Sequence, residues 1–541
     1  MSRILGIDLG TTNTCAAYVS HKIPRVVPTE GGYNTMPSVV TMHPDGSVLV
    51  GQRAKELQHV LPDCTLHDIK RLLGRQYGSR TVQDLVRRFG YKIVPGDKGR
   101  AAVEVRGTAY SAVEVQSKIL AQIKRYAEIN LGEELDTAVI AVPAYYTDQQ
   151  RSLVKEAGKL AGWTVRRIVN EPTAAALAYG FNRGFDQKIL IYDLGGGTFD
   201  VSILELTGNV FQVVATGGDT FLGGADFDDR IAAWIVEQIK KKYKLDVSES
   251  PEALQHVWNA AERAKIELSL LANTQIRLPE LKDHRGRSAD VELVLDRDTL
   301  NTMSRALVQR TLTVIDRLMG ESGLTKADVD EIILVGGQTR MPLVVDAITE
   351  HLGKSPRKGV HPDECVALGA ALLGDSLTKI DAVTLLDALS VPIGIAKPDG
   401  SLQSVLDKHT QIPHTAHVDV QTHTEQQTTF EIEVFQGEAA TAADAEYLGT
   451  LFYEGVPPAP AGQVSLGLDF HLDEEGMLLI TAQDNQGGQR RTLRLATVER
   501  PVAQEPAIQE SAPPSQIREE TSSNSGFKGF MKSLLKGKNS A

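Results

Sequence analysis

The sequence predicts a fold of two parts, an α/β part with two related lobes followed by a β part. From residue 1 to about residue 382, strand-like apolar runs alternate with stretches of helical period, which is the pattern of an α/β unit. From about residue 388, segments such as 430–434 and 464–470 alternate apolar and polar residues between Gly and Pro turns. This alternation is typical of the half-buried strands of a β-sandwich. A loop that occurs twice divides the α/β part into two lobes.

The repeated loop has the sequence IDLGTTN at residues 7–13 and YDLGGGT at residues 192–198. Each copy ends an apolar strand, at residues 4–9 and 189–194. Backbone N–H groups and Thr hydroxyls at such a turn can point at phosphate oxygens, and the Asp can supply oxygen to a hydrated magnesium ion. One copy is weak evidence, because Gly, Thr and Asp also build ordinary turns. Two copies predict two lobes that hold one nucleotide.

Composition excludes several classes of protein. The formal net charge is −12 and the pI about 5.6, so we expect no nucleic-acid partner, which would need a basic face. Cys15, Cys64 and Cys365 are scattered without metal-ligand spacing, as expected of reduced thiols. The N-terminus has no signal-peptide pattern, and no apolar run approaches the roughly 18 residues of a membrane span. We therefore expect a cytoplasmic protein.

Two helices of the α/β part have residues at both ends that are typical of helix starts and stops. A capping box of Thr147 and Gln150 begins the first, and Gly162 ends it. The second begins near Pro172 and ends at Gly180. The apolar residues of the first helix fall on one helical face, and they are Leu153, Val154, Ala157, Leu160 and Ala161.

The C-terminal segment has two sections. Residues 501–526 are rich in Pro, Ser, Gln and Glu, which predicts a disordered tether. Residues 527–538 predict a short amphipathic helix whose apolar stripe lies among lysines and is formed by Phe527, Phe530, Met531, Leu534 and Leu535. Twelve residues are too few for a stable isolated helix, so it should order against a partner. An anionic membrane surface, a segment of another protein and the chain's own peptide groove are the candidates, with an unstructured basic tail as the alternative.

Further motifs follow one another in a specific order. They are DIKRLLGR at 68–75, AVPAYY at 141–146, NEPTAAA at 170–176, GGDTFLGG at 217–224, ERAKIELS at 262–269, ILVGGQTRMP at 333–342 and VTLLD at 383–387. With these motifs and the two loops, residues 3–499 resemble DnaK-type heat-shock chaperones, which belong to the actin and sugar-kinase ATPase superfamily. The joint match is specific, since chance agreement in this order is negligible.

The resemblance implies a duplicated, actin-like two-lobed ATPase domain over 1–382, a linker over 383–387 and a β-sandwich peptide-binding domain over 388–500. It implies an ATP-dependent chaperone that binds and releases unfolded or extended polypeptides. The reaction would be Mg2+-dependent hydrolysis of ATP to ADP and phosphate. By resemblance, the partners would be polypeptide clients, a J-domain cochaperone and a nucleotide exchange factor.

The resemblance also implies roles for single residues in the ATPase domain. Lys70, Glu171, Asp193 and Thr198 would be catalytic, with Asp8 and Asp193 as magnesium carboxylates. Taken alone, Lys70 would be a surface lysine and Glu171 a helix N-terminal acid. The phosphates would lie on Gly10, Thr11, Thr12, Asn13, Gly195, Gly196 and Gly197. The adenosine side would be formed by Glu262, Lys265, Ser269, Gly336, Gly337, Gln338, Arg340 and Asp363.

Residues outside the cavity are assigned in the same way. Coupling between domains would use Pro143, Arg151, Leu385, Leu386 and Asp387. A peptide pocket would be lined by Ile393, Ile395, Phe430 and Ile432, with Pro398 and His423 arching over the peptide.

Several positions depart from the family pattern. Thr384 replaces a usual leucine, Ala225 replaces a common acid, and Phe430 is bulkier than the usual aliphatic residue. Pro398 is a rigid ring where a flexible Met is normal. We expect no helical lid of the usual kind, because residues 501–541 predict mainly disorder.

These departures keep one alternative open, a chaperone-derived regulatory ATPase with a specialised partner and little general peptide binding. A sugar kinase would lack the sandwich and an actin-like filament protein would lack the linker, so both are weaker readings.

Overall fold

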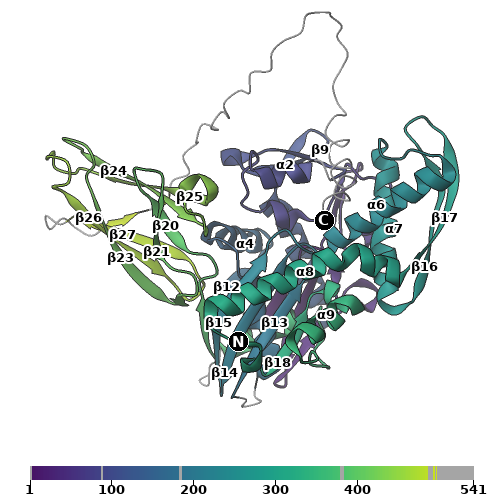
Figure 1. Ribbon diagram of the computed structural model, residues 1–541, viewed down its shortest axis with the longest axis horizontal. Coiled ribbons are helices and arrows are strands. Elements are labelled where there is room, and N and C mark those ends of the chain that lie inside the picture. Colours follow the sequence, from purple (N-terminus) through teal and green to yellow (C-terminus); the bar gives the residue numbers. More distant parts are fainter. Residues whose placement is uncertain are drawn as a thin grey trace, which may run out of the picture.

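The computed structural model describes residues 3–86, 89–181, 186–377, 383–484, 491–493 and 495. They form two lobes and a β part, which lies on the left of Figure 1. The tether expected over 501–526 and the helix expected over 527–538 lie outside the described residues, so both stay predictions. Within the described ranges, none of the helices combines the length and the apolar character that a bilayer crossing requires.

Lobe I is built on a sheet of order β12-β11-β1-β2-β3, with β4 paired to β2. These strands are β1 (Ile4–Leu9), β2 (Asn13–Ser20), β3 (Ile23–Val26), β4 (Met36–Pro37), β11 (Thr137–Val142) and β12 (Thr164–Asn170). Helices α3 (Ala112–Leu131) and α4 (Asp148–Leu160) share one apolar core with the sheet. The outer elements are β5 (Val40–Met42), β6 (Val48–Val50), α1 (Gln52–Glu56), β7 (Thr65–Leu66), α2 (Arg80–Val86), β8 (Lys92–Pro95), β9 (Ala101–Val105) and β10 (Thr108–Ser111).

Lobe II is built on a sheet of order β18-β13-β14-β15, which β19 and β22 extend. Its own strands are β13 (Asp186–Leu194), β14 (Phe199–Thr207), β15 (Val210–Asp219) and β18 (Glu331–Val335). The elements that share its core, several of them at the right of Figure 1, are α6 (Gly224–Tyr243), α7 (Pro251–Leu270), β16 (Asn273–Lys282), β17 (Ser288–Asp296), α8 (Arg297–Ser322) and α9 (Pro342–Leu352).

The two lobes repeat one strand arrangement. In lobe I, β1 pairs antiparallel with β2 and parallel with β11. In lobe II, β13 pairs antiparallel with β14 and parallel with β18. Each copy of the loop joins the first two strands of its lobe, so the repeated sequence lies at equivalent places. The predicted two-lobed, actin-like fold is confirmed.

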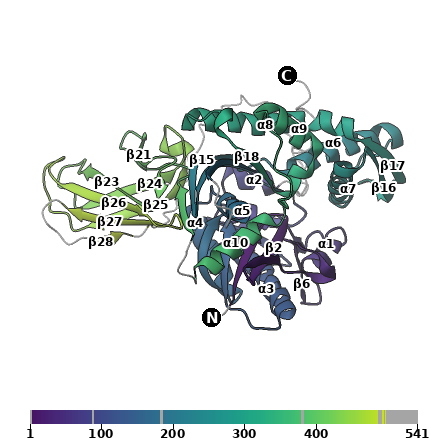
Figure 2. The same ribbon diagram turned by 90° about the horizontal axis from the view of Figure 1, so that it is seen from below.

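Two helices, α5 (Glu171–Gly180) and α10 (Cys365–Ser376), share a core with strands of both lobes (Figure 2). Their small residues allow a close approach. A Cβ atom added at Gly369 of α10 would lie 1.7 Å from the carbonyl oxygen of Ala174 in α5. Nothing larger than glycine fits there without moving one helix.

The β part contains two sheets that enclose a common apolar core. One sheet has the order β21-β20-β24-β25 and the other β23-β26-β27-β28. The strands of these two sheets are β20 (Ile393–Ala396), β21 (Leu402–Leu406), β23 (His414–Gln421), β24 (Thr429–Gln436), β25 (Glu446–Glu454), β26 (Ser465–Leu472), β27 (Leu478–Asp484) and β28 (Arg491–Leu493). Strands β19 (Thr384–Ala388) and β22 (Gln411–Ile412) pair with each other and extend the sheet of lobe II. Short 3-10 turns are η1 (Glu30–Gly32), η2 (Ile69–Leu72), η3 (Asp97–Gly99), η4 (Lys326–Asp328), η5 (Gly337–Arg340) and η6 (Ala442–Asp444).

The predicted helix ends are largely correct. Helix α4 has the capping box of Thr147 and Gln150, and α5 carries a proline in its first turn. Leu160, on the predicted apolar face, is 58% exposed. It is the last residue of α4, whereas Leu153, Val154 and Ala157 of the same face are buried.

Gly→Ala substitutions should have opposite effects at a crowded and at an open helix position. Gly369→Ala should destabilise the protein by about 1–3 kcal/mol, because the added methyl group overlaps a backbone carbonyl. Gly320→Ala in α8 meets no atom within 4 Å and should stabilise by about 0.5–1 kcal/mol, since alanine favours a helix. Midpoints of thermal unfolding compare the two variants with the parent. A Gly369→Ala variant as stable as the parent would contradict this packing.

Candidate functional site

A cavity of about 440 Å³ lies between the two lobes and collects most of the predicted site residues. Both loops line it, together with residues from α7 and from the turn after β18. The predicted residues that line it are Asp8, Gly10, Thr11, Thr12, Asn13, Lys70, Glu171, Asp193, Gly195, Gly196, Thr198, Glu262, Lys265, Gly336, Gly337, Gln338, Arg340 and Asp363. Gly197 and Ser269 are outside this lining.

Glycine is required inside the loops and where they approach each other. A Cβ atom at Gly196 would lie 1.9 Å from the hydroxyl oxygen of Thr12 in the other loop. One at Gly10 would lie 2.2 Å from the carbonyl oxygen of Asn13 in its own loop, and one at Gly197 would lie 2.8 Å from Nε of Arg71. Bare backbone at these positions leaves a cradle of the kind that binds phosphate.

One ammonium group lies at the centre of a cluster of buried carboxylates. Nζ of Lys70, in the turn η2, donates to Oε1 of Glu171 at 2.7 Å, and both side chains are 9% exposed. Burial lowers the pKa of Lys70, but Glu171, Tyr146 and Asp8 outweigh it, so the net shift is upward. The lysine therefore stays charged.

The carboxylates around this lysine have raised pKa values. Burial, with a contribution from Glu171, raises the pKa of Asp8 to about 7 and that of Asp200 to about 7. Burial and the neighbouring acids raise the pKa of Asp193 well above its ordinary value. One lysine does not balance this much negative charge, so the cluster favours a further cation. Asp200 was missed in the sequence, although it stands two residues after the second loop and is 3% exposed.

The donor set fits magnesium rather than a metal held only by protein. Asp8 is the last but one residue of β1 and Asp193 the last but one of β13, so both carboxylates reach the cavity from the loops. Among the described residues, no three His, Cys, Asp or Glu side chains converge closely enough to hold a metal ion. Mg2+ keeps several waters and takes few protein carboxylates, usually beside phosphate oxygens. Asp8 and Asp193 are the residues that would hold it.

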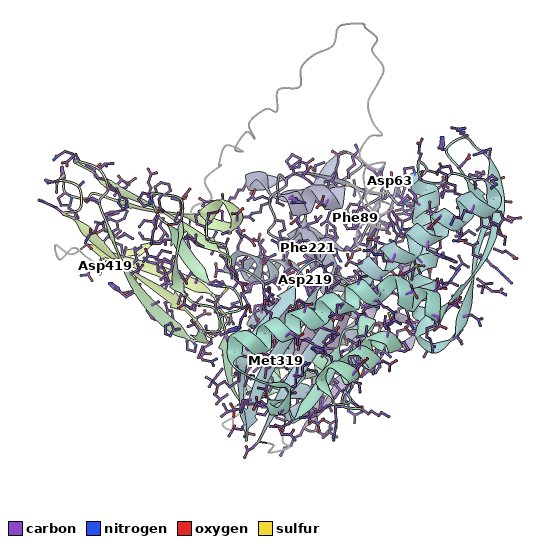
Figure 3. The ribbon with its side chains drawn as sticks, viewed as in Figure 1. Asp63, Phe89, Asp219, Phe221, Met319 and Asp419 are labelled. Atoms are coloured by element: carbon purple, nitrogen blue, oxygen red, sulfur yellow. The ribbon has the colours of Figure 1, made fainter. Side chains whose placement is uncertain are left out.

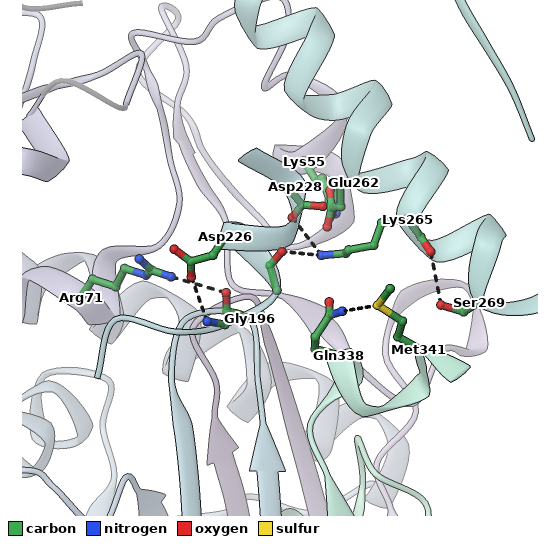
Figure 4. Close-up of polar contacts among 12 residues, drawn as sticks. Lys55, Arg71, Gly196, Asp226, Asp228, Glu262, Lys265, Ser269, Gln338 and Met341 are labelled. Carbon is green, nitrogen blue, oxygen red and sulfur yellow. Dashed lines mark hydrogen bonds and ion pairs between the residues drawn. The ribbon is translucent and has the colours of Figure 1, made fainter. Parts of the chain in front are cut away.

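Other residues of the cavity lining are cations in ion pairs, and Figure 4 shows the pair of Lys265 with Asp228. Nζ of Lys265 donates to the Gly224 carbonyl and to Oδ2 of Asp228, each at 2.9 Å. Burial raises the pKa of Asp228 to about 6, against the opposing effect of Lys265. Arg340 pairs with Asp363 at 2.6 Å. The hydroxyl of Ser269 donates to the Lys265 carbonyl, so it caps its own helix instead of facing the cavity.

An ion pair also bridges the two lobes across the cavity. Nζ of Lys55 in α1 donates to both carboxylate oxygens of Glu262 in α7, at 3.0 and 2.9 Å. Lys55 was not among the predicted site residues. The residues around Lys55 do not indicate a site, because an exposed lysine in a short helix is common.

The residues assigned to domain coupling lie together. The linker forms β19, which pairs parallel with β15, with Leu385 opposite Phe211 and Leu386 opposite Gln212. Its Asp387 accepts from the hydroxyl of Thr173 in α5 at 3.2 Å. Burial lowers the pKa of Arg151 and raises that of Asp387.

Arg151 holds the loop that begins at Pro143. Its guanidinium donates to the Ala144 carbonyl at 3.2 Å and to Oδ1 of Asn170 at 2.8 Å. Pro143 is buried, and its carbonyl accepts from the amide of Tyr146 at 3.1 Å. The predicted coupling residues therefore lie along one path between α4, α5 and the linker.

The β part also contacts both lobes directly. Glu475 pairs with Lys155 of α4, and the amide of Leu478 donates to Oδ1 of Asp148 at 2.8 Å. On lobe II, Lys408 pairs with Glu321 of α8 at 2.7 Å. Other parts of the sandwich are free of these contacts, and Asp419 of β23 lies well away from the lobes in Figure 3.

The residues assigned to a peptide pocket are not exposed. Four side chains face the core between the two sheets and are 2–6% exposed, namely Ile393, Ile395, Phe430 and Ile432. Pro398 and His423 lie in exposed turns after β20 and β23, and the amide of His423 donates to Gln427 at 2.8 Å. Their roles in peptide binding stay predictions.

Comparison with known families agrees with this architecture. The model for the Hsp70 protein family matches residues 4–524, which is almost the whole chain. The match confirms the resemblance seen in the sequence motifs. Proteins of this family are ATPases of the chaperone type that bind ATP or ADP with Mg2+. By the extent of this match, the chain belongs to the Hsp70 protein family.

Proposed function

We propose that this chain is an ATP-driven chaperone in which nucleotide turnover in the cavity controls polypeptide binding by the β part. The observation that carries the proposal is the position of the linker. Strand β19 continues the sheet of lobe II and pairs on its other side with β22 of the β part. A rearrangement of lobe II would therefore reach the β part through backbone hydrogen bonds.

Each group of cavity residues would have its own role in ATP hydrolysis. Bound Mg-ATP supplies the phosphoanhydride bond and the divalent charge. Asp8 and Asp193 would hold the hydrated ion, and the glycines of both loops would hold the phosphates. Lys70 would neutralise charge on the transferring phosphoryl group, and Glu171 would orient Lys70 and the attacking water. The hydroxyl of Thr198 would contact the γ-phosphate.

The adenosine would lie at the other end of the cavity. Glu262, Lys265, Gly337 and Arg340 line this end and would bracket it, with Asp363 near the base. Ser269 would join them only after its hydroxyl leaves the Lys265 carbonyl.

Clients and cochaperones follow from the family. Unfolded or extended polypeptides would be the clients, and a J-domain protein and a nucleotide exchange factor would set the rate of turnover. We propose a cytoplasmic location. Residues 527–538 would add reversible attachment to an anionic surface or a protein partner, a proposal that rests on their sequence alone.

A regulatory ATPase with little general peptide binding is the second candidate function. The burial of all four pocket residues, with Phe430 at 2% exposure, favours it. A client side chain would have to displace one of these groups. A peptide array probed with and without ATP separates the two candidates, because a general chaperone should bind many apolar peptides and a specialised regulator few.

The role of Lys70 predicts a loss of hydrolysis without a loss of binding. Lys70→Ala should slow single-turnover ATP hydrolysis by roughly 10²–10³-fold, because a preorganised charge at the phosphoryl group is removed. Nucleotide affinity should remain measurable by calorimetry. Lys92→Ala is the matched control, since Lys92 pairs with Glu104 on the surface at 76% exposure. An unchanged hydrolysis rate in Lys70→Ala would remove Lys70 from the mechanism.

The contact of Glu475 with Lys155 predicts a charge-swap result. Glu475→Lys should release the β part from lobe I, because two cations then face each other at partly buried positions. Small-angle scattering with ATP should show a larger radius of gyration. Lys155→Glu combined with Glu475→Lys should restore part of the compact form, but not the bond from the Ile168 amide to Glu475.

Glu104→Lys, in a surface ion pair with Lys92, makes the same +2 change of net charge and is the control for it. If Glu475→Lys has the same radius as the parent, this ion pair does not hold the two parts together.

The size of Phe430 predicts a gain of peptide binding in a smaller variant. Phe430→Val should open space beside Ile393 and Ile432 and tighten binding of an apolar peptide several-fold, as read by fluorescence anisotropy. Phe470→Val removes the same volume from β26 in the same core and controls for destabilisation. Equal peptide affinity in the two variants would show that Phe430 does not restrict a pocket.

A further inference from the structure

Two residues before Lys70, the chain takes an unusual backbone conformation. Asp68 has φ = 55°, in the left-handed region that most side chains avoid. It stands directly before the turn η2 (Ile69–Leu72), and its carbonyl accepts from the amide of Arg71 at 3.0 Å. The conformation of Asp68 therefore sets the direction in which the turn leaves β7, and with it the direction of Lys70.

The carboxylate of Asp68 does not cap this turn. It accepts instead from Nδ1 of His67 at 2.7 Å. The two side chains are 18% and 20% exposed, so the bond is shielded from water on most sides. Such a bond offsets part of the cost of the left-handed backbone.

His67 is itself held by two aromatic residues that precede β8. Its ring meets the edges or faces of Phe89 and Tyr91 in near-perpendicular contacts, with centroids 5.1 and 5.5 Å away. The hydroxyl of Tyr91 donates to the His67 carbonyl at 2.5 Å. The aromatic contacts hold the side chain of His67 and the bond from Tyr91 holds its backbone. His67 is therefore in a fixed position to donate to Asp68.

The same residues belong to the wall of the nucleotide cavity. His67, Asp68 and Phe89, the last labelled in Figure 3, line it together with Lys70. Three residues of chain span at most about 11 Å, so His67 stands on the Lys70 half of the cavity. Lys70 has one further support, since the hydroxyl of Tyr146 donates to its carbonyl at 3.4 Å.

We propose that His67 and Asp68 are positioning residues for Lys70. The bond between the two side chains stabilises the left-handed conformation of Asp68. That conformation sets the direction of the turn η2, and the turn places the ammonium of Lys70 beside Glu171. This inference rests on the proposed catalytic role of Lys70. A misplacement of about 1 Å in a catalytic group can cost roughly 100-fold in rate, so the bend would control the rate of hydrolysis and leave nucleotide binding almost unchanged.

Three substitutions of Asp68 separate the backbone from the hydrogen bond. Asp68→Asn keeps an acceptor for His67 and tolerates the left-handed region, so its single-turnover rate should be within about twofold of the parent. Asp68→Gly keeps the bend but loses the bond, and should be intermediate. Asp68→Ala loses both, and should be slower by roughly tenfold to 100-fold with an unchanged dissociation constant for ATP. His67→Phe keeps the aromatic contacts without the donor and should match Asp68→Gly.

Lys98→Ala is the matched control. Lys98 has nearly the same backbone conformation, φ = 54°, in the exposed turn η3, away from the cavity lining. It should carry the same backbone strain and hydrolyse ATP at the parental rate. Thermal unfolding midpoints of all variants identify any that fail to fold, and Asp68→Gly remains informative because glycine relieves strain.

The outcomes distinguish this inference from the function on which it rests. If Lys70→Ala abolishes hydrolysis while Asp68→Ala and Asp68→Gly proceed at the parental rate, the positioning role is wrong and the role of Lys70 stands. If Lys70→Ala itself hydrolyses at the parental rate, the proposed mechanism fails first. A graded loss from Asn through Gly to Ala, with constant ATP affinity, supports the positioning role.

Discussion

The structure depends on one electrostatic constraint, the enclosure of several carboxylates around the ammonium of Lys70. Asp8, Glu171, Asp193 and Asp200 come from β1, α5, β13 and β14, so both lobes contribute carboxylates to the same place. Burial raises the pKa of Asp8, Asp193 and Asp200, and Lys70 opposes this shift. The lobes therefore close most favourably when positive charge is present between them.

This constraint requires the two loops to come close together, and small residues make that possible. Gly196 and Thr12 approach so closely that no Cβ atom fits between them, and behind them Gly369 of α10 packs on the backbone of Ala174 in α5. Larger residues at either place would hold the carboxylates apart. The close packing at these glycines therefore sets the distances between the carboxylates of the two lobes.

Much of this arrangement could be predicted from the sequence, because it is carried by local motifs. The two loops, the capping box at Thr147 and the alternating β segments each specify their own structure through backbone chemistry and periodicity. Distant partners could not be predicted in this way. The bond from Lys55 to Glu262 joins residues of different lobes, and the pairing of Lys155 with Glu475 joins different domains. Neither is visible in a local pattern.

Some positions are not decided by their local pattern. Leu160 fits the apolar stripe of α4, but the helix ends there and leaves it at the surface. Ser269 matches its motif, and its hydroxyl donates to the Lys265 carbonyl of its own helix. The bend at Asp68 gave no signal at all, since an aspartate before a short turn is common. Tertiary contacts decide these positions, and they are absent from a linear pattern.

The first turn of α5 connects the charge cluster to the linker over a very short distance. Glu171 receives Lys70 at 2.7 Å, and two residues later Thr173 donates to Asp387 of β19 at 3.2 Å. Immediately before this turn, Asn170 accepts from Arg151 at 2.8 Å. A rigid helical turn cannot move at one of these points without moving at the others, since its backbone bonds fix their spacing. We propose that a change in charge that shifts Glu171 would reach the linker through the backbone of α5.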